Sequence, residues 1–171
     1  MARTLTAPVK ALYYEDDYIK DILLNIKKIV MVGASPNNSR PSNFAMKYLL
    51  NKGYDIIPVN PNHASKYIYG KLIYNHLRDI PYEYDMIDIF RPSCAVPKII
   101  DDALELNIKS LSVIWMQLNI KNNEAASRAK DAGLKVIMDR CPKIEYARLF
   151  GELGWSGINT GILSAKKRKL L

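Results

Sequence analysis

The chain has 171 residues, of which 49 % are hydrophobic and 25 % are charged, so one globular domain with one sizeable core is expected. No apolar run approaches the roughly 20 residues of a membrane-spanning helix, and the first residues lack the apolar core of a signal peptide. The acidic cluster at residues 15–17 also argues against a transit peptide. We therefore expect a cytoplasmic protein without a membrane partner.

The cysteines and histidines are few and scattered. Cys94 and Cys141 form no C-x-x-C pair, and neither His63 nor His76 has a second metal ligand at a suitable spacing. A disulfide scaffold and a metal site are therefore both disfavoured.

The formal net charge of +8 is partly local, because four positive charges lie at residues 166–169. A basic end of this kind is usually a solvated segment. It leaves a nucleic-acid partner as one alternative, although the sequence has no basic patch interleaved with aromatic residues, as single-strand binders have. The remaining positive charge suits a small anionic ligand.

The first elements surround a turn of small residues. A helix is predicted over residues 15–25, and an unbroken apolar run at residues 29–32 predicts a strand buried on both faces of a parallel sheet. A small-residue turn at 33–35 then leads to a helix predicted over residues 42–52. This order places backbone N–H groups and a helix N-terminus where a phosphate binds in α/β proteins.

Further strands and helices alternate along the rest of the chain. Strands are predicted at residues 55–59, 86–90, 111–116 and 135–138. Helices are predicted over 95–106, from an N-cap at Asn122 to Gly133, and over a last stretch ending near 150. A short extended piece near 71–74 and a helical turn near 77–80 are expected inside the polar stretch between two of the strands. The pattern predicts an α/β fold, with a doubly wound parallel five-stranded sheet in a single domain.

Two helices have sequence patterns that predict their buried faces. The helix over 42–52 is expected to bury Phe44, Tyr48, Leu49 and Leu50. The helix after Asn122 is expected to pack closely on the sheet through Ala125, Ala126, Ala129 and Ala132. We divide the chain into an N-terminal extension with a helix (1–27), the sheet domain (28–150) and a basic tail (151–171).

Binding residues are expected at the carboxyl ends of the strands. These ends carry Gly33, Ala34 and Ser35; Asn60 and Pro61; Arg91, Pro92 and Ser93; Met116 and Gln117; and Asp139, Arg140 and Cys141. Arg40 adds a third arginine in the first loop. Arginine matches phosphate oxygens through two parallel hydrogen bonds, so these residues predict a site for an anionic ligand.

The first loop is not a dinucleotide fingerprint, because only Gly33 of the G-x-G-x-x-G pattern is present. Asn60 also stands where an acid would hold the ribose of NAD. Arg40 suits a ligand with an additional ribose phosphate, which both NADP and coenzyme A carry. The Gly-Lys-Ser/Thr of a Walker loop is absent.

A catalytic constellation is not visible in the sequence. Ser35 has no histidine in a comparable loop, and Asp139 is expected to pair with an arginine rather than to act as a base. Cys141 precedes a helix, whose dipole could lower its pKa, although an inert buried cysteine is the commoner case. One hypothesis keeps Cys141 or Cys94 as a thiol that exchanges disulfides with a ligand thiol.

Five motifs in order carry a family resemblance. They are VGAS with SRPS, IIPVNP, MIDIFRPS with Val96-Pro97, VIWMQL and VIMDRCPKIEY. Over residues 28–149 the chain resembles the stand-alone coenzyme A-binding domain family (the bacterial YccU type). The resemblance implies a Rossmann-like fold related to the coenzyme A-binding domain of succinyl-CoA synthetase, and coenzyme A held in the crevice. The family that it resembles has no established reaction. Acyl-CoA ligation by this chain alone is not implied either, because nothing in this chain supplies the phosphorylated histidine that the related synthetases use.

The resemblance also implies roles for individual residues. The loop Gly33-Ala34-Ser35 would take the pyrophosphate, with Arg40 and Ser42 helping to bind phosphates, and Asn60-Pro61 would border the adenosine. The residues implied for the pantetheine side are Arg91, Val96, Trp115 and Gln117, with Arg140 closing it. Cys94 stands where family members commonly have an acid, which affects local contacts rather than the fold.

These observations predict non-covalent binding of coenzyme A or an acyl-CoA by a binding or regulatory module that is not an enzyme. An NADP-binding oxidoreductase is the alternative, although the sequence offers no clear proton donor. A nucleic-acid accessory protein acting through the basic tail is a third interpretation. A homo-oligomer is compatible with the sequence.

Overall fold

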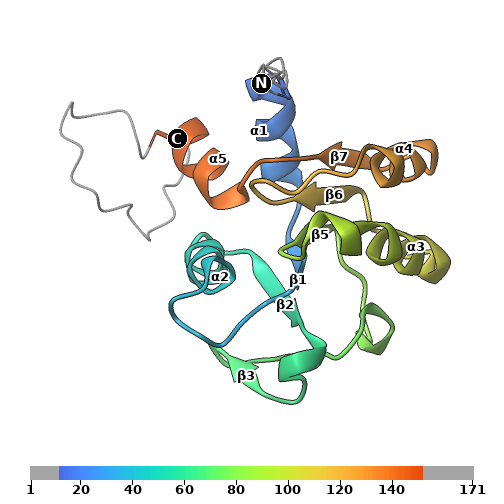
Figure 1. Ribbon diagram of the computed structural model, residues 1–171. Coiled ribbons are helices and arrows are strands. Elements are labelled where there is room, and N and C mark those ends of the chain that lie inside the picture. The colour runs from blue at the N-terminus through green and yellow to red at the C-terminus, as the bar shows by residue number, and fades with distance from the viewer. Residues whose placement is uncertain (1–11, 152–171) are drawn as a thin grey trace, which may run out of the picture.

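The structure is a computed structural model, and it describes residues 12–151 (Figure 1). Its centre is a five-stranded sheet in which the strands lie in the order β2-β1-β5-β6-β7 and all neighbours are parallel. The strands are β1 (Lys28–Val32), β2 (Asp55–Val59), β5 (Met86–Ile89), β6 (Val113–Met116) and β7 (Lys135–Ile137). The predicted single-domain α/β fold with a parallel five-stranded sheet is confirmed.

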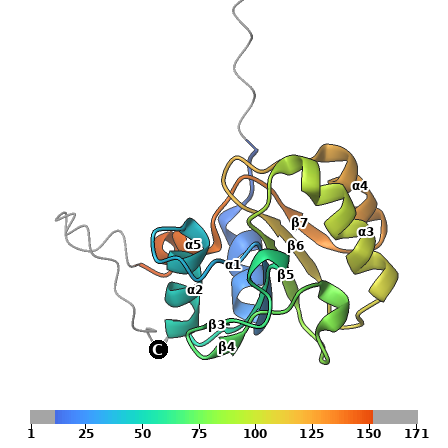
Figure 2. The same cartoon turned by 60° about the horizontal axis from the view of Figure 1, so that its bottom comes forward.

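Helices cover both faces of the sheet, as a doubly wound fold requires (Figure 2). One face carries α1 (Asp16–Asn25), α2 (Pro41–Asn51) and α5 (Pro142–Leu149), and the other carries α3 (Val96–Leu106) and α4 (Asn123–Asp131). Side chains of β1 alternate between the two cores, with Ile29 and Met31 on the α1 side and Val30 on the α3 side. Because both faces are buried, the strand is apolar from Ile29 to Val32.

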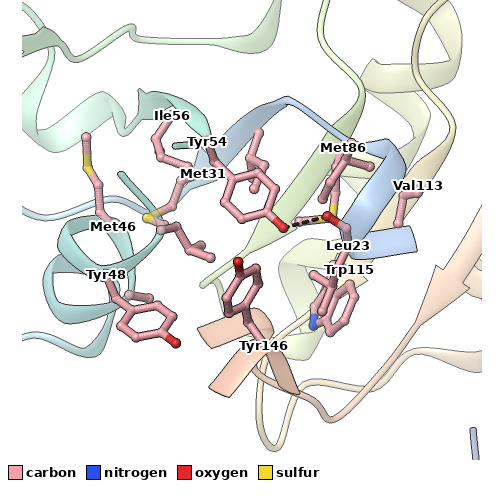
Figure 3. Packing of buried hydrophobic residues seen from close by; sticks show 14 of the residues in the cluster. Leu23, Met31, Met46, Tyr48, Tyr54, Ile56, Met86, Val113, Trp115 and Tyr146 are labelled. Carbon is pink, nitrogen blue, oxygen red and sulfur yellow. Dashed lines mark hydrogen bonds between the residues drawn. The ribbon is translucent and has the colours of Figure 1, made fainter. Parts of the chain in front are cut away.

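Aromatic side chains join the helices of the α1 side (Figure 3). The ring of Tyr146 in α5 lies edge-on to those of Tyr48 in α2 and Tyr54, at centroid distances of 6.2 and 6.1 Å. The Tyr54 hydroxyl donates to the carbonyl oxygen of Leu23 in α1, and burial raises the pKa of Tyr54. These contacts hold α1, α2 and α5 on one face of the sheet.

The connection between β2 and β5 contains a small hairpin. Strands β3 (Tyr67–Ile68) and β4 (Lys71–Leu72) pair antiparallel, and Tyr74 then bridges to Val59 at the end of β2. Two single-turn 3₁₀ helices, η1 (Pro61–His63) and η2 (Leu77–Asp79), flank the hairpin. The extended piece and the helical turn predicted for this stretch are both confirmed.

Two expected core positions are wrong. Phe44 is 54 % exposed, because α2 buries Ser42, Ala45, Met46 and Leu49, a spacing that turns position 44 away from the sheet. Ala132 is exposed, because α4 ends at Asp131 and the chain turns before a further buried position is reached.

The strand order creates a switch point beside β1. The chain moves from β1 to β2 on one side of β1 and later returns to β5 on its other side. The connections that leave β1 and β5 therefore diverge at the carboxyl edge of the sheet, where ligands bind in this architecture. Within residues 12–151, no helix combines the length and the apolar character needed to cross a membrane.

Candidate functional site

Gly33 occupies the switch point at the end of β1. Its φ of +93° is a backbone conformation that favours glycine, and its N–H donates to the carbonyl oxygen of Val59 at 2.8 Å. A Cβ atom at this position would lie 3.0 Å from the carbonyl oxygen of Phe90 and 3.1 Å from Cδ of Arg91. The β1–α2 loop is thus packed against the ends of both β2 and β5, and only glycine fits.

The rest of the β1–α2 loop supplies oxygen acceptors to its own N–H groups. Oγ of Ser42 accepts from the Ser35 N–H at 3.2 Å, and Oγ of Ser35 accepts from the Asn37 N–H, also at 3.2 Å. Ser42 lies in the first turn of α2, where the helix dipole is positive. Two backbone donors are therefore gathered at a helix N-terminus and are held only by neutral hydroxyl oxygens.

Asn60 connects the end of β2 to this loop. Its side-chain Nδ2 donates to the carbonyl oxygen of Ala34 at 2.8 Å, and its Oδ1 accepts from the Asn62 N–H at 3.0 Å. Pro61, which follows, is exposed and begins η1. The structure thus brings the predicted residues of the first two strand ends together.

Asn43 and Tyr69 also belong to this corner, although no motif in the sequence singles them out. Nδ2 of Asn43 donates to the carbonyl oxygen of Ser35 at 3.0 Å, while its Oδ1 accepts from the Tyr69 hydroxyl. Tyr69 lies in the turn between β3 and β4, so the hairpin is attached to the loop through one buried amide. The sequence feature that could have identified Asn43 is its place in the first turn of a predicted helix, where an asparagine amide can form hydrogen bonds outside the helix.

The two arginines nearest the switch point are exposed. Arg40 is the residue before α2, and its side chain makes no capping bond to the helix. Arg91 follows β5, with Cδ next to Gly33. Arg40 is therefore the last residue of the β1–α2 loop, and Arg91 lies beside the first residue of that loop. Val96, in contrast, is fully buried between α3 and the sheet.

The loops after β5, β6 and β7 are tied to one another. The Lys121 N–H donates to Oγ of Ser93 at 3.1 Å, and Nδ2 of Asn122 donates to the Ser93 carbonyl oxygen at 3.3 Å. Asp139 accepts from the Asn119 N–H at 2.7 Å and pairs with Nζ of Lys121 at 2.8 Å. These contacts lower the pKa of Asp139, Lys121 contributing most. The expected ion pair is present, but its partner is a lysine rather than an arginine.

Trp115 and Arg140 lie away from the β1–α2 loop. Trp115 is fully buried, and its Nε1 donates to the Arg140 carbonyl oxygen at 2.8 Å. The Arg140 guanidinium donates to the Leu12 carbonyl oxygen at 2.6 Å and lies over the Tyr14 ring. It is also 3.7 Å from Oε1 of Glu145. The ligand roles implied for Trp115 and Arg140 stay predictions.

Asp88 is an acidic residue near the carboxyl end of β5 that the sequence motifs did not identify as part of the site. It is completely buried in β5, and both of its oxygens accept from Nε2 of Gln117, at 2.9 and 3.1 Å. Burial raises the pKa of Asp88 to about 7, and the Gln117 hydrogen bond opposes that rise. A single acid within the apolar run of residues 86–90 was the signal that could have identified it.

The two cysteines differ in exposure. Cys141 is buried, and desolvation raises the pKa of its thiol, with Asp88 adding to the effect. The structure therefore reverses the lowered pKa that the helix dipole alone would favour, and it weakens the hypothesis of thiol exchange at Cys141. Cys94 is exposed. No group of three potential metal ligands lies together in the part of the chain that the structure describes.

A concave region of about 270 Å³ lies between η2 and the C-terminal half of α3, where its lining includes His76, Arg78, Asp102 and Glu105. These residues belong to neither the strand ends nor the β1–α2 loop. The chemistry of the glycine loop and the arginines, rather than the depth of a groove, identifies the candidate site at the switch point.

The five-stranded parallel sheet with helices on both faces defines a Rossmann-like domain, and the β1–α2 loop is its candidate binding site. The family model described as "CoA binding domain" matches residues 27–147. The chain is 35 % identical over 129 residues to the uncharacterized protein YneT of Bacillus subtilis, covering 75 % of this chain and 92 % of YneT. The chain therefore belongs to the CoA-binding domain family, as the sequence motifs predicted.

Two further relatives agree with this membership. Subunit alpha of the ADP-forming acetate–CoA ligase I of Pyrococcus furiosus is 30 % identical over 98 residues, which are 55 % of this chain and 21 % of that subunit. A solved structure of a hypothetical protein from Pyrococcus horikoshii OT3 shares 37 % identity with a TM-score of 0.74. That match covers 88 % of this chain and all of the other.

Proposed function

We propose that the chain binds coenzyme A or an acyl-CoA non-covalently, as a binding or regulatory module without catalysis of its own. Membership of the CoA-binding domain family supports the class of ligand. The observation that carries the proposal is the β1–α2 loop at the switch point, where Gly33 allows close approach and two N–H donors meet a helix N-terminus.

The pyrophosphate would bind at this loop. Its charged oxygens would replace the neutral hydroxyl oxygens of Ser35 and Ser42 as acceptors for the loop N–H groups, and hydrogen bonds to a charged acceptor are stronger. Arg40 and Arg91 border the loop and would add guanidinium donors. Asn60 holds the Ala34 carbonyl oxygen and so keeps the loop in shape.

The polar groups of the carboxyl edge support binding rather than catalysis. Asp139 is engaged by Lys121 and by a backbone N–H, which favours its charged form and makes it a poor base. The buried Cys141 thiol has a raised pKa and is a poor nucleophile. The Ser35 hydroxyl oxygen accepts from a loop N–H.

Thermal unfolding of the full chain with coenzyme A, NADP and NAD in parallel tests the class of ligand. A ligand present at a hundred times its dissociation constant stabilises the folded state by about 2.7 kcal/mol. Coenzyme A is expected to give this stabilisation and the two dinucleotides much less. A shift with NADP alone would support the alternative oxidoreductase, and no shift with coenzyme A would contradict the proposal.

Two glycine variants test the place of binding. Gly33→Ala would bring a Cβ against Phe90 and Arg91 and disturb the loop, so coenzyme A affinity should fall about tenfold or more. Gly133→Ala is the matched control, because Gly133 also has a positive φ of +86° but no atom within 4 Å of its added Cβ. Titration calorimetry should show nearly normal affinity for the control, and equal losses in both variants would move the site elsewhere.

The remaining predictions concern the protein in its surroundings. A cytoplasmic location and a homo-oligomeric state stay predictions. The basic segment at residues 166–169 lies outside the described residues, as do residues 1–11, so the nucleic-acid interpretation also stays a prediction.

A further inference from the structure

Asp88 is a buried acid in an apolar environment. Its neighbours in the sheet are Met31 of β1 and Trp115 of β6, which offer no charge. The titratable group that faces it from α5 is the thiol of Cys141 at the start of that helix. Gln117 is the hydrogen-bond partner that the structure gives to the Asp88 carboxyl group. A lone buried acid of this kind costs stability.

The Asp88 carboxylate determines which way the Gln117 amide points. An ionised carboxylate can only accept hydrogen bonds, so the Gln117 group that faces it must be the NH₂ donor. The amide is planar, and its carbonyl oxygen Oε1 is therefore directed away from Asp88. Within residues 12–151, no hydrogen bond is found at this Oε1. While Asp88 is ionised, Gln117 thus presents an acceptor at the carboxyl end of β6.

The strand order sets the distance between the Gln117 acceptor and the β1–α2 loop. Gln117 directly follows β6, which is two strands from β1, and neighbouring strands lie about 4.8 Å apart. With the pyrophosphate at the β1–α2 loop, the β6 end is about 10 Å away on the side opposite β2. The pantetheine arm extends from the pyrophosphate over such distances, and its two amide groups carry N–H donors.

We propose that Asp88 is a positioning residue that fixes the Gln117 amide so that its carbonyl oxygen accepts a hydrogen bond from a pantetheine N–H. The inference rests on the proposed coenzyme A function and adds a specificity for the pantetheine arm. It also predicts a dependence on pH. When Asp88 is protonated, its O–H can donate to Oε1, so the Gln117 amide can turn and present its NH₂ group to the ligand, where two donors would meet.

Calorimetric titrations of the full chain test this with two ligands, coenzyme A and adenosine 3′,5′-bisphosphate, which lacks the pantetheine arm together with the β-phosphate that joins it to the nucleotide. The measured quantity is the ratio of their dissociation constants at pH 6 and pH 8. In the wild type, coenzyme A should lose about three- to tenfold more affinity than the bisphosphate as the pH falls, the range for one hydrogen bond. In Asp88→Asn, the affinity for coenzyme A at pH 8 should fall by a similar factor, and the additional pH dependence should disappear.

Titration of the ligand phosphates is common to wild type and variant, so the difference between them isolates Asp88. Gln117→Met should also weaken coenzyme A binding about three- to tenfold, and adding Asp88→Asn should cause no further loss, because both substitutions remove one contact. Unchanged bisphosphate affinity shows that each variant is folded. If Asp88→Asn misfolds, the same comparison of the wild type with Gln117→Met decides, because that variant also removes the contact and should abolish the additional pH dependence.

The possible results separate the two proposals. If neither ligand binds the wild type, the proposed function fails. If both ligands bind but Asp88→Asn and the wild type give the same ratio at both pH values, Asp88 does not act through Gln117 and the inference is overturned, while coenzyme A binding stands.

Discussion

At the scale of single residues, the carboxyl edge contains one position set by backbone geometry and one set by charge. Gly33 is required because its φ is positive and Phe90 and Arg91 leave no space for a side chain. Asp88 is retained in β5 although burial disfavours its charged form. The structure therefore constrains which residue type can occupy each of these two positions, at the edge where the ligand is proposed to bind.

Asp88 should make stability depend on pH in a known direction. Its pKa is raised from 3.8 to about 7 on folding, so the native state binds more protons than the unfolded state between these values. The free energy of unfolding should therefore fall as the pH rises from 4 to 7. Each pKa unit corresponds to about 1.4 kcal/mol, which gives roughly 2–4 kcal/mol in total.

The variant Asp88→Asn replaces the carboxyl group by an uncharged group of the same shape. Urea unfolding should give similar stability for wild type and variant near pH 4 and a more stable variant at pH 8. A stability difference that is constant over this pH range would show that Asp88 is not the group responsible.

Single residues could be predicted from the sequence where their role depends on neighbouring residues in the chain. A glycine after an apolar run indicates a turn, so the loop at 33–35 could be found. Asp88 could not be assigned, because its partner Gln117 is 29 positions away in sequence. Arg140 was expected to face a ligand, yet its guanidinium donates to the carbonyl oxygen of Leu12, from which it is separated by 128 positions in sequence.

At the scale of elements, the loops of the carboxyl edge form two groups. The β1–α2 loop is connected to β2 through Asn60 and to the β3–β4 turn through Asn43 and Tyr69. The loops after β5, β6 and β7 are connected through residues 119–122. The switch point lies between the two groups, so a ligand bound there would contact both.

Asn122 is expected to matter for one of these groups. Its Oδ1 accepts from the Ala125 N–H at 2.9 Å and so caps α4, as the sequence predicted, and its Nδ2 reaches Ser93. Asn122→Ala should lower the free energy of unfolding by about 0.5–2 kcal/mol. The exposed neighbour gives a control, Asn123→Ala, which should change stability by less than about 0.5 kcal/mol. Equal effects of the two variants in urea unfolding would count against the cap.

The type and order of the elements could be predicted because apolar runs and caps are local signals. The face of α2 could not be predicted well, because a shift of one residue changes which side chains meet the sheet. Phe44 was assigned to the core on hydrophobicity, whereas the actual spacing places Ser42 and Ala45 there. Small side chains at these positions let the helix N-terminus lie close to the loop.

At the scale of the whole molecule, the candidate site is assembled from segments distant in sequence. Parallel strands in the order β2-β1-β5-β6-β7 bring Asn60, Gly33, Arg91 and Gln117 to one edge of the sheet. The doubly wound topology therefore explains why strand ends could be selected from sequence as binding positions. It does not fix side-chain directions, which is why Val96 and Trp115 turn out to be buried.

Because the proposed site lies within residues 33–117, the basic tail should be dispensable for coenzyme A binding. Deleting residues 166–171 should change the dissociation constant for coenzyme A by less than about twofold at physiological salt, where distant charges are screened. Any affinity for single-stranded nucleic acid, measured by fluorescence anisotropy, should fall with the deletion. A large loss of coenzyme A binding would instead place the tail in the ligand site.

The most direct measurement is the change in backbone amide NMR shifts when coenzyme A is added to the ¹⁵N-labelled full chain. Binding at the switch point should cause large, saturable shift changes for Gly33, Ser35 and Asn37 and smaller ones for Gln117. Residues lining the groove between η2 and α3, such as Arg78 and Glu105, should be unaffected. Changes confined to that groove, or none at coenzyme A concentrations up to the millimolar range, would contradict binding at the switch point.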